Sequence, residues 1–414
     1  MSNVINKYSN LLLLLLAIVT SIPCSVSAHG EKALEPFIRM RTIQWYDVQW
    51  SKSDLRVNDE LEIIGRFHVA EDWPISVPKP EATYLNVAAP GPVFIRKERY
   101  LNGQPTLTSF KLEEGGDYTF KIVLKARMPG RYHIHPFFNL HDAGAVVGPG
   151  QWVEISGDAS DFTNQVTLLN GEIIDMETYG LSNAIYWHAL WIIAGTVWLL
   201  WWLRRPLFIQ RYRMLAAGQE DLLVTPTDKL IGKAILVGVA AIVLTGYYTA
   251  QQNHPNAIPL QAARDMIEPL PPLVNNGNVG VRVKKVMYRV PERTMQMSIL
   301  VENRTDTPLQ VGEFSVANVR FITADVIADN DQNNSELVAK DGLRIDDLSP
   351  IAPGETKTLS LEAKDAAWET EKLDGLIRDA DSRMGGLLFL YGTDRERHIV
   401  SLSAPVIPEY VSTQ

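Results

Sequence analysis

The chain has 414 residues, enough for two or three domains, and its 46% hydrophobic and 21% charged residues are typical of a folded protein. Its net charge of −9 argues against a nucleic-acid-binding protein, which would carry a basic surface. The one cysteine, Cys24, lies in a segment that we expect to be removed. Zinc-finger, iron–sulfur and blue-copper sites, which need cysteine sulfur, are therefore excluded.

Residues 1–28 are predicted to be a cleaved signal peptide. Lys7 precedes an unbroken apolar run from Leu11 to Val19, and Val26-Ser27-Ala28 offers small or modest residues for cleavage before His29. The alternative is an uncleaved transmembrane anchor, but the apolar run is shorter than the roughly 20 residues that span a bilayer. We therefore expect the mature chain to begin at His29.

Residues 29–170 are predicted to form a first β domain. Glu62–Val69, Tyr118–Leu124 and Gln151–Ile155 alternate in hydrophobicity or are apolar over the length of a strand, and glycine-rich turns such as Glu114–Asp117 separate them. Several short strands at this spacing indicate a β-sandwich or a barrel.

Two histidines share one face of a predicted strand in this domain. They are His133 and His135, within the stretch Arg131–Pro136. Residues i and i+2 of a strand project to the same side, so two imidazoles stand next to each other, an arrangement that suits copper or zinc. Alone, the pattern is weak, because two partly exposed strand histidines would give the same sequence.

His29 strengthens the metal hypothesis. If cleavage follows Ala28, His29 has a free α-amino group, which deprotonates near neutral pH and joins its own imidazole in chelating a metal. Ligation by nitrogen alone favours copper(II). His68 is expected in a half-buried strand position, and His141 is expected in a loop that could lie near the metal.

Two apolar runs, residues 184–203 and 230–250, have the length of membrane-spanning helices. The alternative is two buried core helices. The loop between them, residues 204–229, carries several basic residues and is therefore predicted to be cytoplasmic, which places both flanking domains outside the cytoplasm. His188 lies within the first span, where an ionisable group hints at function or is hydrogen-bonded within a helix bundle.

Residues 265–414 are predicted to form a second β domain. Met295–Val301 and Thr356–Leu361 have the pattern of strands. The domain contains one histidine, His398, on a predicted strand, and we interpret the domain as structural because one imidazole does not make a metal site. His254, between the second span and this domain, precedes Pro255 and is expected in a loop.

Long motifs along the mature chain resemble the B subunit of the copper membrane monooxygenases, the particulate methane and ammonia monooxygenases. The resemblance rests on His29-Gly-Glu, Arg39–Asp47, Leu85-Asn-Val, Pro90–Lys97, Leu124–Arg127, His133-Ile-His135, Gly148-Pro-Gly150, Tyr186–Ala189, Arg204-Arg-Pro206, Asp341-Gly-Leu343 and Ala352–Glu355.

The resemblance implies a mainly β protein with two cupredoxin-like β-sandwich domains, both periplasmic, joined by two transmembrane α-helices in a bacterial inner or intracytoplasmic membrane. It implies a trimer of three-subunit protomers, with partner subunits of the A and C types. It also implies copper held by His29, His133 and His135. Some methane-oxidising members bind a further copper with two histidines. His68 matches one of these, but Gln44 occupies the other position, which makes His68 a weak candidate.

Gln44 is also the reason for preferring ammonia to methane as the substrate, because Thr42-Ile-Gln-Trp-Tyr-Asp47 resembles ammonia monooxygenases. The expected reaction takes ammonia, O₂ and two electrons to hydroxylamine. A methane monooxygenase subunit is the first alternative. The second is a periplasmic copper carrier or scaffold without catalysis of its own.

Overall fold

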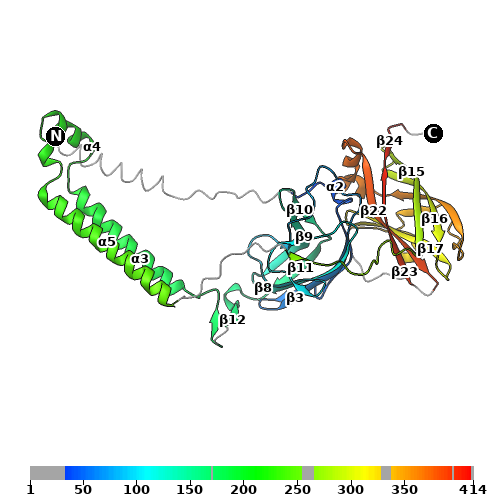
Figure 1. The fold of residues 1–414 in the computed structure, drawn as a ribbon, viewed down its shortest axis with the longest axis horizontal. Coiled ribbons are helices and arrows are strands. Elements are labelled where there is room, and N and C mark those ends of the chain that lie inside the picture. The colour runs from blue at the N-terminus through cyan, green and yellow to red at the C-terminus, as the bar shows by residue number, and fades with distance from the viewer. Residues whose placement is uncertain (1–32, 169–170, 254–264, 328–336, 394–395, 412–414) are drawn as a thin grey trace. The chain divides into compact units, whose positions relative to one another are not determined.

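The computed structural model describes residues 33–168, 171–253, 265–327, 337–393 and 396–411. These residues divide into two compact units. One unit, residues 163–253, is mostly helical, and the other contains both β domains. The predicted signal peptide, His29 and His254 lie outside the described residues. The prediction of a mainly β protein with two apolar helices is confirmed (Figure 1).

The first β domain is built from two sheets whose inner faces share one core. One sheet has the order β1-β3-β8-β5-β6, and the other has the order β14-β7-β4-β9-β11-β2, with β10 beside β9. Trp45 of β1 and Phe138 of β9 stack across the core with ring centroids 4.9 Å apart. The strands are β1 (Ile43–Trp50), β2 (Asp54–Arg56), β3 (Glu60–Val69), β4 (Thr83–Ala88), β5 (Phe94–Leu101), β6 (Gln104–Pro105), β7 (Phe110–Lys111), β8 (Asp117–Ala126), β9 (Gly130–Leu140), β10 (Gly144–Val147), β11 (Gln151–Ser156) and β14 (Asp265–Met266), and a short 3₁₀ turn, η1, covers Ala159–Asp161.

Strand β9 places the two histidines of the His-x-His pattern outside this core. Ile134 and Phe138 on its inner face are fully buried. Because successive side chains of a strand alternate, His133 and His135 project from the opposite face. One edge of β9 pairs with β4, whereas the other pairs with β11 over its first half and with β10 over its second half. The loop between β10 and β11 therefore lies beside His135.

The second β domain also consists of two sheets, with the orders β20-β21-β16-β15-β24 and β19-β18-β17-β22-β23. Its core includes Trp368, which is fully buried and stacks on Phe321 at 5.2 Å. The strands are β15 (Val279–Arg289), β16 (Thr294–Asn303), β17 (Leu309–Val316), β18 (Val319–Ile322), β19 (Val338–Ala339), β20 (Leu343–Ile345), β21 (Thr356–Lys364), β22 (Arg383–Gly392), β23 (Arg397–Pro405) and β24 (Ile407–Glu409), with the short helices α6 (Ala324–Ile327), α7 (Ala367–Thr370) and η3 (Leu373–Arg378).

The segment that leads into β1 joins the two β domains. It contains the short helix α2 (Pro36–Arg39). Met40 is fully buried in the core of the second domain, whereas Ile43, three residues later, belongs to the core of the first. A Cβ atom on Gly385 would lie 2.6 Å from the carbonyl oxygen of Met40, so a glycine there lets the two backbones approach. Both cores therefore need this segment.

Polar side chains also cross between the β domains. Arg397 donates from Nη1 to Oδ1 of Asp47 at 2.8 Å, and its Nη2 contacts the other carboxylate oxygen. Arg383 donates from Nε to Asp72 at 2.7 Å. Such charge-assisted pairs have defined geometry, and they fix how the second domain is oriented on the first.

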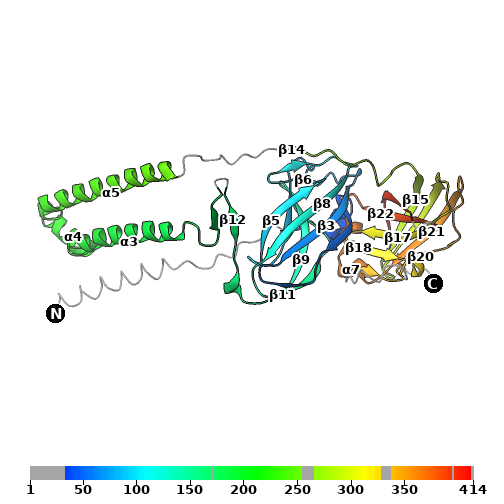
Figure 2. The ribbon, with the colours of Figure 1, turned by 90° about the horizontal axis from the view of Figure 1, so that it is seen from below.

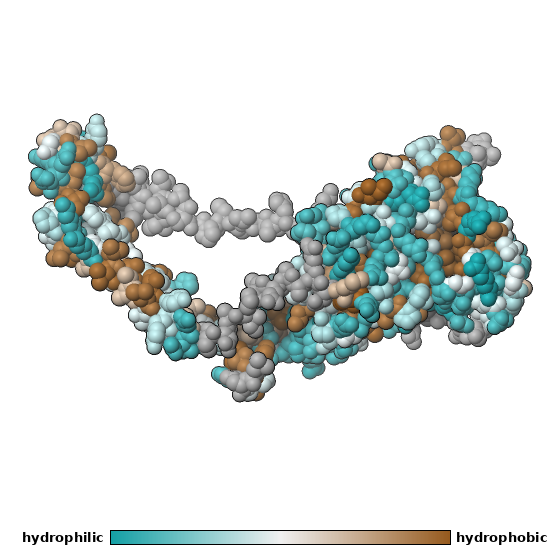
Figure 3. Space-filling model, viewed as in Figure 1, coloured by the Kyte–Doolittle hydropathy of each residue, from teal (hydrophilic) through white to brown (hydrophobic). Residues whose placement is uncertain are grey.

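The helical unit contains two long antiparallel helices, α3 (Leu181–Leu203) and α5 (Pro226–Asn253), which lie side by side in both ribbon views (Figures 1 and 2). A Cβ on Gly246 of α5 would lie 3.0 Å from the indole of Trp187 on α3. Both helices are long and apolar enough to cross a membrane, and their apolar side chains are largely exposed (Figure 3). The unit also contains the hairpin β12 (Gln165–Thr167) and β13 (Ile173–Asp175), the helix α4 (Phe208–Ala216) and the turn η2 (Glu220–Leu222).

A buried carboxylate fastens the two long helices at one end. Asp228 accepts hydrogen bonds from the indole of Trp201 at 3.0 Å, from Arg205 Nε at 2.9 Å and from the backbone N–H of Thr225 at 2.8 Å. These donors come from the end of α3 and from the residue before α5. Asp228 therefore both caps the start of α5 and ties it to α3.

Candidate metal centre

His133 and His135 form the centre of the candidate site. The Nε2 atom of His135 lies 3.0 Å from the Nδ1 atom of His133, and the two rings meet edge to face with centroids 4.5 Å apart. Strand β9 imposes this juxtaposition because the two residues share its outer face. Two ring nitrogens therefore converge on one point, as the His-x-His pattern predicts.

A backbone carbonyl fixes the tautomer of His135. Its Nδ1 lies 2.9 Å from the carbonyl oxygen of Gly148. A carbonyl oxygen can accept but not donate, so Nδ1 carries the proton and the neutral ring presents the lone pair of Nε2 towards His133. Burial lowers the pKa of His135, and the nearby His133 and Arg39 lower it further, against the opposing effect of the Gly148 contact. The ring is thus kept in the neutral form that ligates metals.

The loop Gly148-Pro149-Gly150 holds His135 by close approach. A Cβ on Gly150 would lie 2.3 Å from Cε1 of His135, and one on Gly148 would lie 3.0 Å from the indole of Trp45. No side chain fits at either place without a shift. The sequence contained this signal, because two glycines flanking a proline next to a paired strand indicate close backbone approach, but its link to His135 emerged only from the fold.

Aromatic and cationic groups line the outer side of His133. Its ring lies 4.9 Å from that of Trp152 on β11, and the guanidinium of Arg131 lies 4.7 Å from the same indole. Trp152 is 41% exposed, so this side of the pair is open to the surroundings. Neither residue was a site candidate from the sequence, since the cross-strand pairing of His133 with Trp152 depends on the register of β11.

The residues present fit copper ligation in part. The 3.0 Å between the two ring nitrogens is a spacing that two ligands of one ion adopt at metal–nitrogen bonds of about 2.0 Å. The environment offers nitrogen and no thiolate, as copper(II) prefers. Among the described residues, no group of three or more histidine, cysteine, aspartate or glutamate side chains could hold a metal ion. The predicted third ligand, His29, lies outside the described residues.

The start of the described chain lies on the same sheet as the histidine pair. Ala33 bridges to Ala145 of β10, and the N–H of Leu34 donates to the Ala145 carbonyl at 2.9 Å. His29 is four positions before Ala33 in the sequence, and four residues of extended chain reach at most about 14 Å.

His68 has a different environment from the half-buried position that we predicted. It is fully buried on β3, with Nδ1 2.9 Å from Oδ1 of Asp117. Its cross-strand neighbour Gln44 donates from Nε2 to the Met40 carbonyl at 2.9 Å and accepts from Ser401 at 3.1 Å. Both polar atoms of Gln44 are therefore engaged in hydrogen bonds between protein groups, and a second copper at His68 stays a prediction.

The remaining histidines lie apart from the pair. His141 follows β9 and is six residues beyond His135, about 20 Å along the strand. It contacts the carboxylate of Asp142 at 3.4 Å. His188 on α3 contacts the carbonyl oxygen of Ala184 at 2.7 Å. His398 on β23 is 2% exposed, and neither of its ring nitrogens has a hydrogen-bond partner among the described residues. None of them extends the candidate site.

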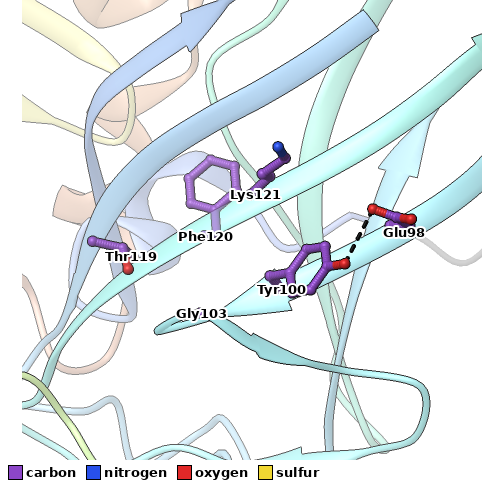
Figure 4. A pocket seen from close by; sticks show the side chains of 6 residues that line it. All are labelled: Glu98, Tyr100, Gly103, Thr119, Phe120 and Lys121. Atoms are coloured by element: carbon purple, nitrogen blue, oxygen red, sulfur yellow. Dashed lines mark hydrogen bonds between the residues drawn. The ribbon is translucent and has the colours of Figure 1, made fainter. Parts of the chain in front are cut away.

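Two surface depressions of the first domain lie away from the pair. One of about 270 Å³ lies over β5 and β8, where the hydroxyl of Tyr100 donates to Glu98 at 3.1 Å (Figure 4). Another of about 560 Å³ lies around His141 and Asp142. Neither includes His133 or His135. The pair itself is half-buried on the outer face of β9.

Comparison with known proteins shows the family to which the chain belongs. The family model for the B-subunit protein of monooxygenases matches residues 30–410. The particulate methane monooxygenase alpha subunit of Methylococcus capsulatus is 44% identical over 388 residues, which cover 94% of this chain and 93% of that protein.

Solved structures give weaker likenesses. The crystal structure of the cupredoxin domain of amoB from Nitrosocaldus yellowstonii is 19% identical, covers 28% of this chain and 89% of that chain, and has a TM-score of 0.24. A PapD-like domain of human CEP192 is 9% identical, covers 39% of this chain and 100% of that chain, and has a TM-score of 0.19. Likenesses at these TM-scores do not bear on the site.

Proposed function

Because the chain belongs to the family of monooxygenase B subunits, we propose that it is the copper-binding subunit of an ammonia monooxygenase. The proposed reaction combines ammonia, O₂, two electrons and two protons into hydroxylamine and water. The observation that carries the copper assignment is the convergence of His135 Nε2 and His133 Nδ1 at 3.0 Å. Family membership supports oxidoreductase chemistry for the complex and leaves open which subunit performs the oxidation.

The proposed copper ligands are the amino group and imidazole of His29 with the imidazoles of His133 and His135. Bound copper would supply one-electron redox chemistry towards O₂. The protein's part is to hold nitrogen ligands in place: the Gly148 carbonyl keeps the proton of His135 on Nδ1, and the absence of a side chain at Gly150 leaves the space that the ring occupies. This division of roles is typical of metal sites, in which outer groups orient the ligands.

The preference for ammonia rests on Gln44 within Thr42–Asp47. Its amide bridges the Met40 carbonyl and the Ser401 hydroxyl, so this position is a structural link between the β domains rather than a ligand. Methane is the second candidate substrate, and the observation that favours it is the name of the 44% identical relative, a particulate methane monooxygenase subunit.

The proposed setting is a bacterial inner or intracytoplasmic membrane, with both β domains periplasmic and the loop between α3 and α5 cytoplasmic. Two apolar helices of 23 and 28 residues support this setting. Arg204, Arg205, Arg211 and Arg213 in the connecting segment support the orientation. The exposed apolar surface of the two helices needs lipid or protein around it, and partner subunits of the A and C types in a trimer of heterotrimers would cover part of it.

The decisive test of the copper ligands uses the full chain, co-expressed with its partner subunits in membranes. The variants are His133→Ala, His135→Ala and an insertion of one serine between Ala28 and His29, each compared with the unmodified chain. We expect each change to remove or alter the copper(II) EPR signal assigned to this site and to lower the copper content of the complex. Unchanged copper content and spectra in both alanine variants would overturn the assignment.

The substrate is tested separately with the same membranes. Oxidation of ¹⁵N-labelled ammonia to hydroxylamine is measured against oxidation of ¹³C-labelled methane to methanol under O₂. Faster ammonia turnover supports the proposal, whereas faster methane turnover favours the second candidate. A complex that retains full activity after loss of copper at His133 and His135 would show that this subunit is a carrier or a scaffold.

A further inference from the structure

The second β domain reaches the loop that orients His135. We infer that Asn318 of the second domain and Arg39 of the segment before β1 are positioning residues for the copper ligands. The inference rests on the proposed copper site, and it assigns to the second domain a role in the geometry of a site on the first. From the sequence we interpreted the second domain as structural, because it contains one histidine.

Both residues bind one carbonyl oxygen. Asn318 donates from Nδ2 to the carbonyl of Val147 at 2.9 Å, and Arg39 donates from Nη1 to the same oxygen at 2.7 Å. Val147 is the last residue of β10, immediately before Gly148. A carbonyl oxygen has two lone pairs, so the two donors occupy both of its acceptor positions.

The peptide between Val147 and Gly148 comes immediately before the carbonyl group that contacts His135. The N–H of Gly148, on the other side of that same peptide, donates to the carbonyl of Pro136 at 2.8 Å. The orientation of the Val147–Gly148 peptide is therefore fixed at both its oxygen and its nitrogen. The next carbonyl along, that of Gly148, accepts the proton of His135 Nδ1 at 2.9 Å. Rotation of the Val147–Gly148 peptide would move the Gly148 carbonyl away from His135, and Nδ1 of His135 would lose the acceptor that keeps its proton there.

Asn318 is presented by a tight hairpin. Ala317 and Asn318 connect β17 to β18, and both have positive φ, 43° and 79°. Two consecutive residues at positive φ make the turn that joins antiparallel strands through two residues. Asparagine tolerates this conformation, whereas alanine does so at a cost, so Ala317 stores local strain. The strained tip is the part of the second domain that contacts Val147.

The hairpin can hold Val147 in place because several contacts join the two β domains. Arg397 binds Asp47 through two contacts, and Arg383 binds Asp72. Met40, one residue after Arg39, is fully buried in the core of the second domain. Arg39 and Asn318 thus approach Val147 from elements that both belong to the contact between the domains.

The test replaces Asn318 by glycine in the full chain within its complex. Glycine keeps the positive φ of the turn and removes the amide donor. Asn58→Gly is the matched control, because Asn58 has φ 77° and donates from Nδ2 to the Asp161 carbonyl at 2.8 Å, away from the histidine pair. Asn318→Asp is the third variant, since it keeps the size of the side chain and turns a carboxylate oxygen towards the Val147 carbonyl.

The readouts are the copper(II) EPR parameters, the copper affinity measured by competition with a chelator, and the thermal unfolding temperature. We expect Asn318→Gly to lower the copper affinity roughly threefold to tenfold and to change the EPR spectrum. Loss of a group that contacts a metal ligand directly typically costs about tenfold to 100-fold in metal affinity, and Asn318 acts one peptide further away. Asn318→Asp should have the larger effect. Asn58→Gly should change neither the affinity nor the spectrum, even if it lowers the unfolding temperature equally.

Two failures are distinguishable. If copper binding by the unmodified chain does not depend on His133 and His135, the proposed function fails. If it does depend on them but Asn318→Gly and Asn318→Asp match the unmodified chain in affinity and spectrum, the inference about Asn318 is overturned and the copper site stands.

Discussion

Two histidine environments in the first β domain show what separates a ligand from a structural residue. His135 and His68 each have Nδ1 2.9 Å from an oxygen atom, of Gly148 and of Asp117 respectively. Their other ring nitrogens differ. Nε2 of His135 faces Nδ1 of His133, whereas Nε2 of His68 has no hydrogen-bond partner among the described residues and is sealed inside the protein.

The oxygen atoms beside the two histidines also differ, because the Asp117 carboxylate next to His68 accepts further hydrogen bonds. Oδ2 of Asp117 accepts the backbone N–H groups of Leu273 and Val274, at 2.7 and 2.9 Å. These residues lie in the segment between β14 and β15, where the chain passes from the first domain to the second. His68 thus supports a carboxylate that anchors this crossing segment. A buried pair of this kind contributes to the stability of the fold, whereas the half-buried pair on β9 lies outside the core, where it can take a ligand.

The largest expected effect is the difference in copper affinity between the variants His135→Ala and His68→Ala. His135→Ala removes a proposed ligand, so we expect the copper affinity of this site to fall by more than about 100-fold, beyond the range for outer-shell partners. His68→Ala should leave the copper affinity of the site at His133 and His135 unchanged within about twofold, since His68 is buried on β3 and contacts Asp117 rather than the pair. Copper titration of the full chain in its complex, followed by EPR, measures both. Copper loss of the same size in His68→Ala would mean that the two environments do not differ as described.

The second expected effect concerns thermal stability, for which replacing His68 should matter more than replacing a histidine of the pair on β9. His68→Ala leaves a buried carboxylate without one of its partners and opens a cavity, at a cost of about 3 kcal/mol. For β domains of this combined size, that cost corresponds to a fall in the unfolding temperature of about 5 °C. His133→Ala, at a partly exposed position, should lower it by less than about 1 °C. Calorimetry of metal-free protein compares the two, and Asp117→Asn combined with His68→Ala tests whether the pair acts as one unit.

How far the sequence predicts this site depends on the range of the interaction. His133 and His135 were predictable as neighbours because their juxtaposition follows from the two-residue period of a strand. The burial of His68 was not, because it depends on Asp117, 49 residues away on β8. The contact of Asn318 with Val147 spans 171 residues and depends on the docking of one domain on the other. Local periodicity carries no information about such contacts.

The same distinction applies to the fold. Strands such as β3, β8, β11, β16 and β21 were predicted because their hydrophobic pattern is local. The burial of Met40 in the second domain was not predicted, although it lies three residues before the first strand of the first domain. Its placement is decided by the space beside Gly385, a residue more than three hundred positions later. The placement of Met40 therefore depends on packing between segments that are distant in the sequence, which the local hydrophobic pattern does not describe.

A smaller effect should follow from crowding His135 without removing it. Gly150→Ala introduces a Cβ that would lie 2.3 Å from Cε1 of His135, so the ring or the loop must shift. We expect the copper affinity to fall about tenfold, with a change in the EPR spectrum. Gly195→Ala on α3 is the control, since nothing lies within 4 Å of a Cβ there. If both variants bind copper as tightly as the unmodified chain, the Gly148–Gly150 loop does not hold the ring in the ligating position.

The smallest expected effect concerns the open side of the pair. Trp152→Leu keeps an apolar residue on β11 but removes the ring that lies 4.9 Å from His133. An aromatic contact of this kind contributes about 0.5 kcal/mol, so the copper affinity should fall about twofold. His135 is held by Gly148 and Gly150 and should keep its orientation, which means that the EPR spectrum should broaden rather than change type. A loss as large as that of Gly150→Ala would show that stacking on Trp152, rather than the glycine loop, sets the geometry of the two imidazoles.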